Sequence, residues 1–313
     1  MKPAVLILGA TGTIGQGAVR AAVEASWPVV AVARDAEALQ ELRRRYPKAR
    51  LQTLVGSVAD DASADALVAA LQKLSRPFAG VIAALGGGRE RGRLLDQSST
   101  QLRQTFDDAV LPHLVAARHL LPWLGGSGRN CGYVVIGGPG GRHPWAGYGH
   151  RSVAAAAVQM LARVLHGEAR AFSVRLQLLE VESPVRTDAN ELHACEQWPC
   201  VDAIGRKALT LLEHRNDARC TGAVIDYRSN ACQAATGRAD VDFAGHGSSD
   251  LKDDLTLEQR ETPQLHPSVE ISGIEAQEMD SSASLLPARC LQDVRKLLET
   301  FTPTTKKNQE RTR

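Results

Sequence analysis

Three glycines recur at every third position near the start of the chain, in the segment GATGTIG. They lie between a short apolar run and a stretch with helical spacing. Small residues at such a turn let the backbone bend sharply, approach a pyrophosphate and pack the helix against the strand. The N–H groups and the dipole at the helix start favour an anion. The spacing predicts a dinucleotide-binding turn rather than an empty tight turn, with contacts from Gly9, Thr11, Gly12, Thr13, Ile14 and Gly15.

A cation and an acid follow the second apolar run, as Arg34 and Asp35. An acid at this place binds the ribose hydroxyls of NAD, whereas a cation accommodates the 2′-phosphate of NADP. Arg34 comes first, and Asp35 is well placed to cap the next helix. The pair therefore favours NADP, with Arg34 as a plain solvated charge the alternative.

The elements that would position these residues alternate along the chain. Short apolar runs typical of buried strands cover 4–9, 28–33, 51–55, 80–85, 132–137, 173–181 and 222–227. Helical periodicity covers 14–26, 35–46, 61–75, 99–124 with a break near Pro112, 148–170 and 201–213. This alternation predicts an α/β fold: a Rossmann-type doubly wound sheet of about seven parallel strands, covered on both faces, over residues 1–230.

The chain changes character after this domain. Residues 231–284 are acidic and polar, so we expect a mobile linker. An apolar stripe returns over 285–301, which predicts an amphipathic helix docked on a folded domain, followed by a polar end to residue 313.

Composition narrows the class of protein. With 43% hydrophobic and 23% charged residues the chain is typical of a globular protein, and wholesale disorder is excluded. A net charge of +2 and 4% aromatics argue against a nucleic-acid partner. No apolar run approaches the roughly 20 residues that span a bilayer, so we expect no membrane partner and a cytoplasmic location. Six scattered cysteines predict reduced thiols and no metal site.

Taken in order, these segments resemble the short-chain dehydrogenase/reductase family over about residues 3–229. GATGTIG is similar to the family's cofactor loop in its GxxGxxG spacing. The resemblance implies that Ser57 and Val58 lie beside the adenine, and that Ala84 and Gly86 follow the fourth strand where the family has Asn-Ala-Gly. Val185 and Thr187 resemble the end of the family's PGxVxT segment near the nicotinamide, with Glu182-Ser183 in place of its Pro-Gly.

The family's catalytic residues match poorly, which implies an atypical member with a degraded Ser-Tyr-Lys set. The fifth strand ends in Gly137-Gly138, where the family has serine. Tyr148 corresponds to the catalytic tyrosine, but Ser152 stands at the lysine position. The family's helical asparagine falls near Asp108 or Ala109. Of the four catalytic residues, the resemblance therefore leaves Tyr148.

A phenol keeps its proton at neutral pH, so without the lysine Tyr148 would serve better as an acid in reduction than as a base in oxidation. The alternative is a packing or helix-capping tyrosine. His143, His150 and Arg151 lie nearby, although each is more simply explained as a solvated side chain. Two arginines in the loop 86–91 would meet a cofactor phosphate, an acidic substrate or only solvent.

The sequence thus predicts an NADP-dependent reductase of an unknown carbonyl or unsaturated small molecule with a non-standard proton donor. A catalytically silent dinucleotide-binding sensor or partner protein is one alternative, and a non-redox isomerase or cyclase on the same scaffold is another. The family resemblance also implies a homodimer that pairs the helices at 99–124 and 148–170.

Overall fold

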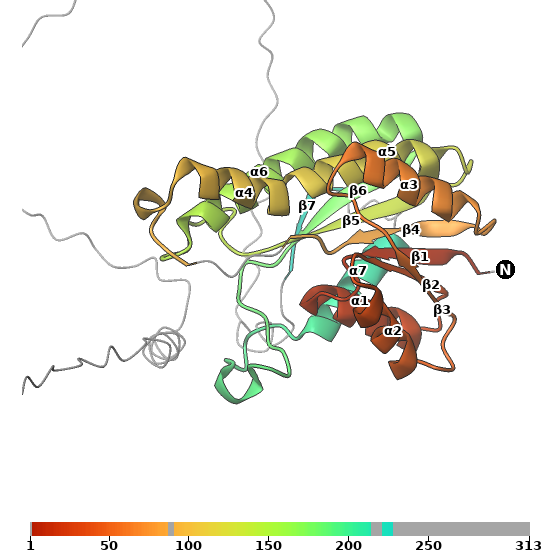
Figure 1. Ribbon diagram of the computed structural model, residues 1–313, viewed down its shortest axis with the longest axis horizontal. Helices are drawn as coiled ribbons and strands as arrows, with labels where there is room; N and C mark the ends of the chain where they lie inside the picture. The colour runs from red at the N-terminus through yellow and green to blue at the C-terminus, as the bar shows by residue number, and fades with distance from the viewer. Residues whose placement is uncertain (1, 87–90, 214–220, 228–313) are drawn as a thin grey trace, which may run out of the picture. The chain divides into compact units, whose positions relative to one another are not determined.

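Seven strands form one parallel sheet in the computed structural model, which describes residues 2–86, 91–213 and 221–227 (Figure 1). Their order is β3-β2-β1-β4-β5-β6-β7, which confirms the predicted fold class. The strands are β1 (Ala4–Leu8), β2 (Val29–Ala33), β3 (Leu51–Val55), β4 (Phe78–Ala83), β5 (Cys131–Gly137), β6 (Val174–Glu180) and β7 (Val224–Asp226). The predicted linker and C-terminal helix lie outside the described residues and stay predictions.

The central strands are apolar along their whole length because both of their faces are covered. Every residue of β1, β2 and β4 is buried. Parallel strands with helices on both faces bury inward and outward side chains alike, so apolar runs replace the alternation seen in half-exposed strands. Continuous runs of apolar residues therefore predict these strands from the sequence.

Helices cover the two faces of the sheet in separate layers (Figure 1). One core contains side chains from α3, α5 and α6, and the other contains side chains from α1, α2 and α7. The helices are α1 (Thr13–Glu24), α2 (Ala36–Arg45), α3 (Asp61–Gln72), α4 (Ser99–Ala109), α5 (Leu111–Gly125), α6 (Gly149–Glu168) and α7 (Val201–Glu213). None of the described helices is long and apolar enough to cross a membrane.

Local sequence signals set several helix ends. The Asp35 carboxylate caps α2, accepting from the backbone N–H groups of Glu37 and Ala38. The break expected near Pro112 separates α4 from α5 at Val110. Proline fits the first turn of α5, where its missing N–H has no intrahelical partner anyway.

A close helix crossing fixes α1 against α7. An added Cβ on Gly17 would lie 2.5 Å from the Val201 carbonyl oxygen, and one on Gly205 would lie 2.5 Å from the Gly17 carbonyl oxygen. Only glycine at both positions allows this approach. The crossing holds α1, and hence the glycine turn before it, firmly on the sheet.

The strand order reverses direction at β1, which has β2 on one side and β4 on the other. In open α/β sheets, ligands bind outside the carboxyl ends of the strands at such a switch point. The candidate residues at the ends of β1, β2, β3 and β4 therefore meet at one edge.

Candidate functional site

Gly9 begins the turn between β1 and α1 and has to be glycine. Its φ of +69° is left-handed, and an added Cβ would lie 2.2 Å from the Ala84 carbonyl oxygen. The Ala84 N–H donates to the Leu8 carbonyl at 3.1 Å. The ends of β1 and β4, which carry the predicted cofactor-binding residues Gly9 and Ala84, are thus packed backbone against backbone.

Gly15 and Gly12 have different roles in the same turn. A Cβ on Gly15 would lie 2.0 Å from the Gly9 carbonyl oxygen, so the helix sits directly on the turn. Gly12 is the N-cap of α1, and no side chain caps this helix. Thr13, exposed at the helix start, and the half-buried Thr11 and Ile14 complete the turn. The N–H groups at the start of α1 are therefore available to an anion such as a pyrophosphate.

Arg34 and Asp35 differ in what they already bind. Asp35 Oδ1 accepts from the N–H groups of Glu37 at 2.9 Å and Ala38 at 3.0 Å. Arg34 is exposed and makes no hydrogen bond or ion pair within the described part of the chain. The acid is engaged by the helix while the cation at the end of β2 is available, so the pair fits a 2′-phosphate.

The residues after β3 and β4 line the same edge. Ser57 Oγ accepts from the Ala59 N–H at 3.1 Å, while Val58 is buried in the core. Gly86 is exposed with a φ of +104°, and an added Cβ would lie 4.0 Å from Ala109 Cα. Ala109, one of the two positions that the resemblance predicts for the family asparagine, therefore lies beside Gly86. It offers no side-chain amide.

Tyr148 stands at the start of α6 between an aromatic ring and two cations. Its ring stacks on Trp145 with centroids 4.7 Å apart. The guanidinium of Arg91 lies 5.7 Å and that of Arg151 lies 5.6 Å from the Tyr148 ring centroid. Arg151 therefore contacts the tyrosine through its ring face.

Ser152 uses its hydroxyl to hold the loop that precedes α6. Its Oγ accepts from the Trp145 N–H at 2.9 Å and donates to the Tyr148 carbonyl at 3.2 Å. Gly140, with a φ of +101°, approaches so closely that an added Cβ would lie 2.8 Å from this oxygen. The loop thus packs against Ser152, the position that the resemblance predicts for the family lysine.

Two buried histidines were missed or misjudged from the sequence. His150 is 3% exposed, so its interpretation as a solvated side chain is wrong, whereas His143 is exposed as expected. His113, which the sequence gave no reason to single out, is also 3% exposed. Burial lowers the pKa of its imidazole from 6.5 to about 4, against the opposing effect of a hydrogen bond with the Leu85 backbone. His113 is therefore neutral at neutral pH, beside the end of β4.

The segment after β6 is held by its own hydrogen bonds. The Thr187 N–H donates to Asn190 Oδ1 at 2.7 Å, and Asn190 Nδ2 donates to the Val185 carbonyl at 3.0 Å. Asn190 was not among the predicted residues. It fixes the backbone of Val185 and Thr187, for which the family resemblance predicts a place near the nicotinamide.

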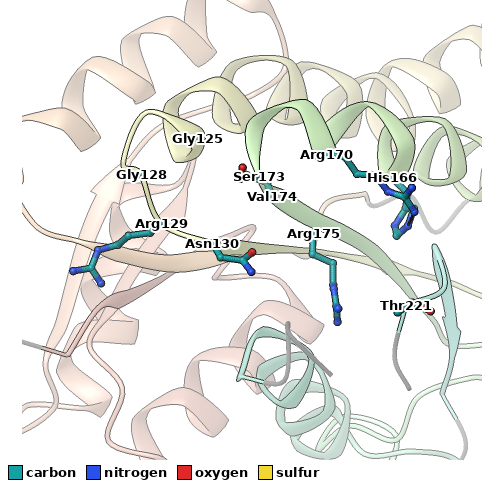
Figure 2. Close-up of a pocket in the computed structure, with 10 residues that line it drawn as sticks. All are labelled: Gly125, Gly128, Arg129, Asn130, His166, Arg170, Ser173, Val174, Arg175 and Thr221. Atoms are coloured by element: carbon teal, nitrogen blue, oxygen red, sulfur yellow. Dashed lines mark hydrogen bonds between the residues drawn. The ribbon is translucent and has the colours of Figure 1, made fainter. Parts of the chain in front are cut away.

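A hollow of about 760 Å³ lies at the opposite edge of the sheet (Figure 2). It is next to the start of β5 and β6, away from the glycine turn. In Figure 2, Arg129 points away from Arg170 and His166 rather than toward a common centre. This hollow does not coincide with the site at the carboxyl edge. In the described ranges, no group of His, Cys, Asp and Glu side chains is arranged to hold a metal.

Comparisons with known proteins agree with this geometry. The sequence model of short chain dehydrogenases matches residues 3–193, more than half of the chain. A short-chain dehydrogenase from Streptomyces avermitilis is 24% identical with a TM-score of 0.60, and the match covers 76% of this chain and 92% of that one. No curated protein matches the chain.

Two further structures from Pseudomonas aeruginosa PAO1 are described as a short chain oxidoreductase containing an atypical catalytic center. The apo structure is 20% identical with a TM-score of 0.63, covering 73% of this chain and 96% of that one. The NADPH-bound structure is 20% identical with a TM-score of 0.61, covering 72% and 96%. At these identities, the likeness shows a common fold.

Proposed function

The chain belongs to the short-chain dehydrogenase family, and from this premise we propose that it is an NADP-dependent reductase of a carbonyl or unsaturated small molecule. Members of the family are typically NAD(P)-dependent oxidoreductases that act on small molecules. The observation that most supports NADP is the contrast at the end of β2, where Asp35 caps α2 and Arg34 is available. The NADPH-bound structure from Pseudomonas aeruginosa PAO1 agrees with this choice.

Each part of the carboxyl edge would hold a different part of the cofactor. The turn from Gly9 to Gly15 would bind the pyrophosphate, and Arg34 the 2′-phosphate. Ser57 and Val58 would flank the adenine. Ala84, Gly86, Val185 and Thr187 would border the nicotinamide. When bound, NADPH supplies a hydride to the substrate.

Tyr148 is the proton donor that we propose for the reduction. Its hydroxyl would give a proton to the substrate oxygen or carbon that becomes negative. In this proposal the catalytic set is reduced: the resemblance aligns Gly137-Gly138 with the family serine, Ser152 with the lysine, and Asp108 or Ala109 with the asparagine. Arg91 and Arg151 keep positive charge near the Tyr148 ring, which favours any anionic charge that develops beside it.

Replacing Arg34 with alanine tests the cofactor assignment. The variant should bind NADPH about 10–150 times more weakly, the loss expected for one hydrogen bond to a charged group, about 1.5–3 kcal/mol. NADH binding should change little. Fluorescence titration of both nucleotides measures this, and Arg43→Ala, an exposed arginine on α2, is the matched control. Equal losses for both nucleotides would show that Arg34 does not bind the 2′-phosphate.

A catalytically silent dinucleotide-binding protein is the second candidate. It is favoured by Ser152, which the resemblance aligns with the family's lysine. Ser152 has no ammonium group, and its hydroxyl accepts a hydrogen bond from the Trp145 N–H. Mixing the protein with NADPH and a panel of aliphatic and aromatic aldehydes and ketones separates the two. Consumption of NADPH supports the reductase, whereas tight NADPH binding without turnover supports the silent protein.

We further propose that the chain is a homodimer that pairs α4, α5 and α6 with a second copy. The outer faces of two of these helices expose apolar side chains, namely Leu111, Leu114, Val153, Met160 and Val164. The alanine-rich stretch VAAAAV at 153–158 allows close helix approach.

The assembly is checked by light scattering at micromolar concentration, where the wild type should have twice the mass of one chain. Met160→Glu combined with Val164→Glu should give a monomer, because two charges would be buried without partners. Leu192→Glu is the control, since Leu192 is 93% exposed and lies outside these helices. A monomeric wild type would refute the proposal.

A further inference from the structure

Two acids lie side by side where β6 and β7 end. Glu180 and Asp226 are the last residues of their strands and are paired in register. Like charges opposite one another on neighbouring strands repel. Glu180 is also only 2% exposed, so its charge needs a partner inside the protein.

Arg142 supplies this partner from the loop between β5 and α6. Its guanidinium donates two hydrogen bonds to the Asp226 carboxylate, from Nη2 to Oδ1 and from Nη1 to Oδ2. Arg142 Nη2 also lies 2.8 Å from Glu180 Oε2, an ion-pair distance without hydrogen-bond alignment. On the other side, Gln159 Nε2 of α6 donates to Glu180 Oε1 at 2.5 Å. One arginine therefore connects the loop to two strand ends.

The Glu182 carboxyl lies close to the backbone of Arg142. Burial and the neighbouring Glu180 carboxylate raise the pKa of the Glu182 carboxyl, whose hydrogen bond with the Arg142 backbone opposes that rise. The carboxyl groups of Glu180, Glu182 and Asp226 thus all lie near one guanidinium, that of Arg142.

Further hydrogen bonds and a ring contact hold the β5–α6 loop near its other end. The Trp145 N–H donates to Ser152 Oγ, and the Trp145 ring stacks on Tyr148. The Gly92 N–H donates to the Gly147 carbonyl at 2.8 Å, which joins the loop to the segment after β4. Arg142 therefore fixes the start of a loop whose end carries the proposed proton donor.

We propose that Arg142 is a positioning residue, which fastens the β5–α6 loop to the ends of β6 and β7 and so holds Trp145 and Tyr148 at the carboxyl edge. This inference rests on the proposed function, because Tyr148 needs a fixed place only if it donates a proton to the substrate. Removing the fastening should leave the glycine turn, and hence NADPH binding, intact.

The test uses a double variant of the full chain, Arg142→Gln with Glu180→Gln. Arg142→Gln alone leaves Glu180 buried without its cation, which is strongly destabilising and can unfold the protein. The double variant removes both charges and keeps side chains of similar size. Arg142→Lys keeps the charge but cannot bind two acids in the same way. Arg44→Gln is the control, because Arg44 forms an exposed ion pair with Glu41 on α2.

Amide hydrogen exchange reports on the loop without any substrate. In the folded double variant, the amides of Trp145 and Tyr148 should exchange at least about ten times faster, a change of about 1.4 kcal/mol in local opening, while those of β1 do not change. Arg142→Lys should give an intermediate rate, and Arg44→Gln the wild-type rate. Unchanged protection of Trp145 and Tyr148 in the folded double variant would overturn the proposal.

Enzyme kinetics separate this inference from the proposed function. If the wild type reduces a carbonyl compound, the double variant should show kcat at least about tenfold lower with NADPH affinity within about twofold of the wild type. An unchanged kcat would also overturn the positioning role. If the wild type binds NADPH but reduces nothing in the panel, the proposed reductase fails, and the exchange rates alone decide whether Arg142 holds the loop.

Discussion

Replacing Gly15 with alanine is expected to lower the free energy of unfolding by about 3 kcal/mol, at the upper end of overpacking costs, and to weaken NADPH binding by at least about tenfold. The new Cβ would lie 2.0 Å from the Gly9 carbonyl oxygen and within 3 Å of two further backbone atoms of Gly9 and Ala10. Backbone cannot rotate away as a side chain can. The start of α1 must therefore move off the turn, and the N–H groups proposed to bind the pyrophosphate move with it.

Gly12→Ala is the matched control within the same turn. Its Cβ would lie 3.3 Å from the Gly9 carbonyl oxygen, and Gly12 has a φ of −72° that alanine adopts without strain. We expect a loss of unfolding free energy below about 1 kcal/mol, in line with alanine replacing glycine at an N-cap. Urea denaturation followed by tryptophan fluorescence gives both values. Equal stability of Gly15→Ala and Gly12→Ala would contradict the packing described for α1.

The free energy of unfolding should fall by about 2–3 kcal/mol between about pH 7 and pH 4.5 because of His113 alone. In the unfolded chain this imidazole has the ordinary pKa of 6.5. Burial in the folded chain lowers its pKa to about 4. Between these values the unfolded state holds more protons, so stability decreases as the pH falls through 6.5 toward 4. Above 6.5 this contribution to stability is fully present.

His113→Gln should remove this slope, because glutamine does not titrate. Urea denaturation at several pH values between about 4.5 and 7.5 measures it. His119, on the same helix, provides a control of opposite sign, since the hydrogen bond that its ring donates to the Asp61 carboxylate raises the pKa of its imidazole. Its stabilisation is present below 6.5 and lost as the pH rises through its folded pKa. If His113→Gln keeps the wild-type slope between pH 4.5 and 6.5, the buried neutral state of His113 is wrong.

Local features of the chain could be predicted from the sequence because neighbouring residues determine them. The glycine turn is specified by three residues within seven positions, and Gly9 and Gly15 meet each other directly in the structure. The helix cap at Asp35 and the break near Pro112 likewise depend on hydrogen bonds within a few residues. Continuous apolar runs were enough to identify the buried strands and, with the alternating helices, the parallel sheet.

The surroundings of Tyr148, the proposed proton donor, depend on contacts that sequence spacing does not encode. The burial of His113 and His150 follows from how α5 and α6 pack on the sheet. The sequence around each histidine does not indicate whether its side chain is buried or exposed to solvent. The sequence also gave no sign of the hydrogen bond by which the Trp145 N–H binds the Ser152 hydroxyl, because these residues belong to a loop and to the helix that follows it.

The sequence by itself determined the fold class and the place of the glycine turn, because strand runs, helix caps and tight turns are set by residues close together in the chain. Only the tertiary structure decided how the acids that end β6 and β7 find a cationic partner. Arg142 is 84 residues from Asp226, and they meet because β5, β6 and β7 are adjacent in the sheet. Pairings of this kind depend on the strand order and on which face each side chain takes. A single sequence specifies them only through the complete packing of the sheet and its helices.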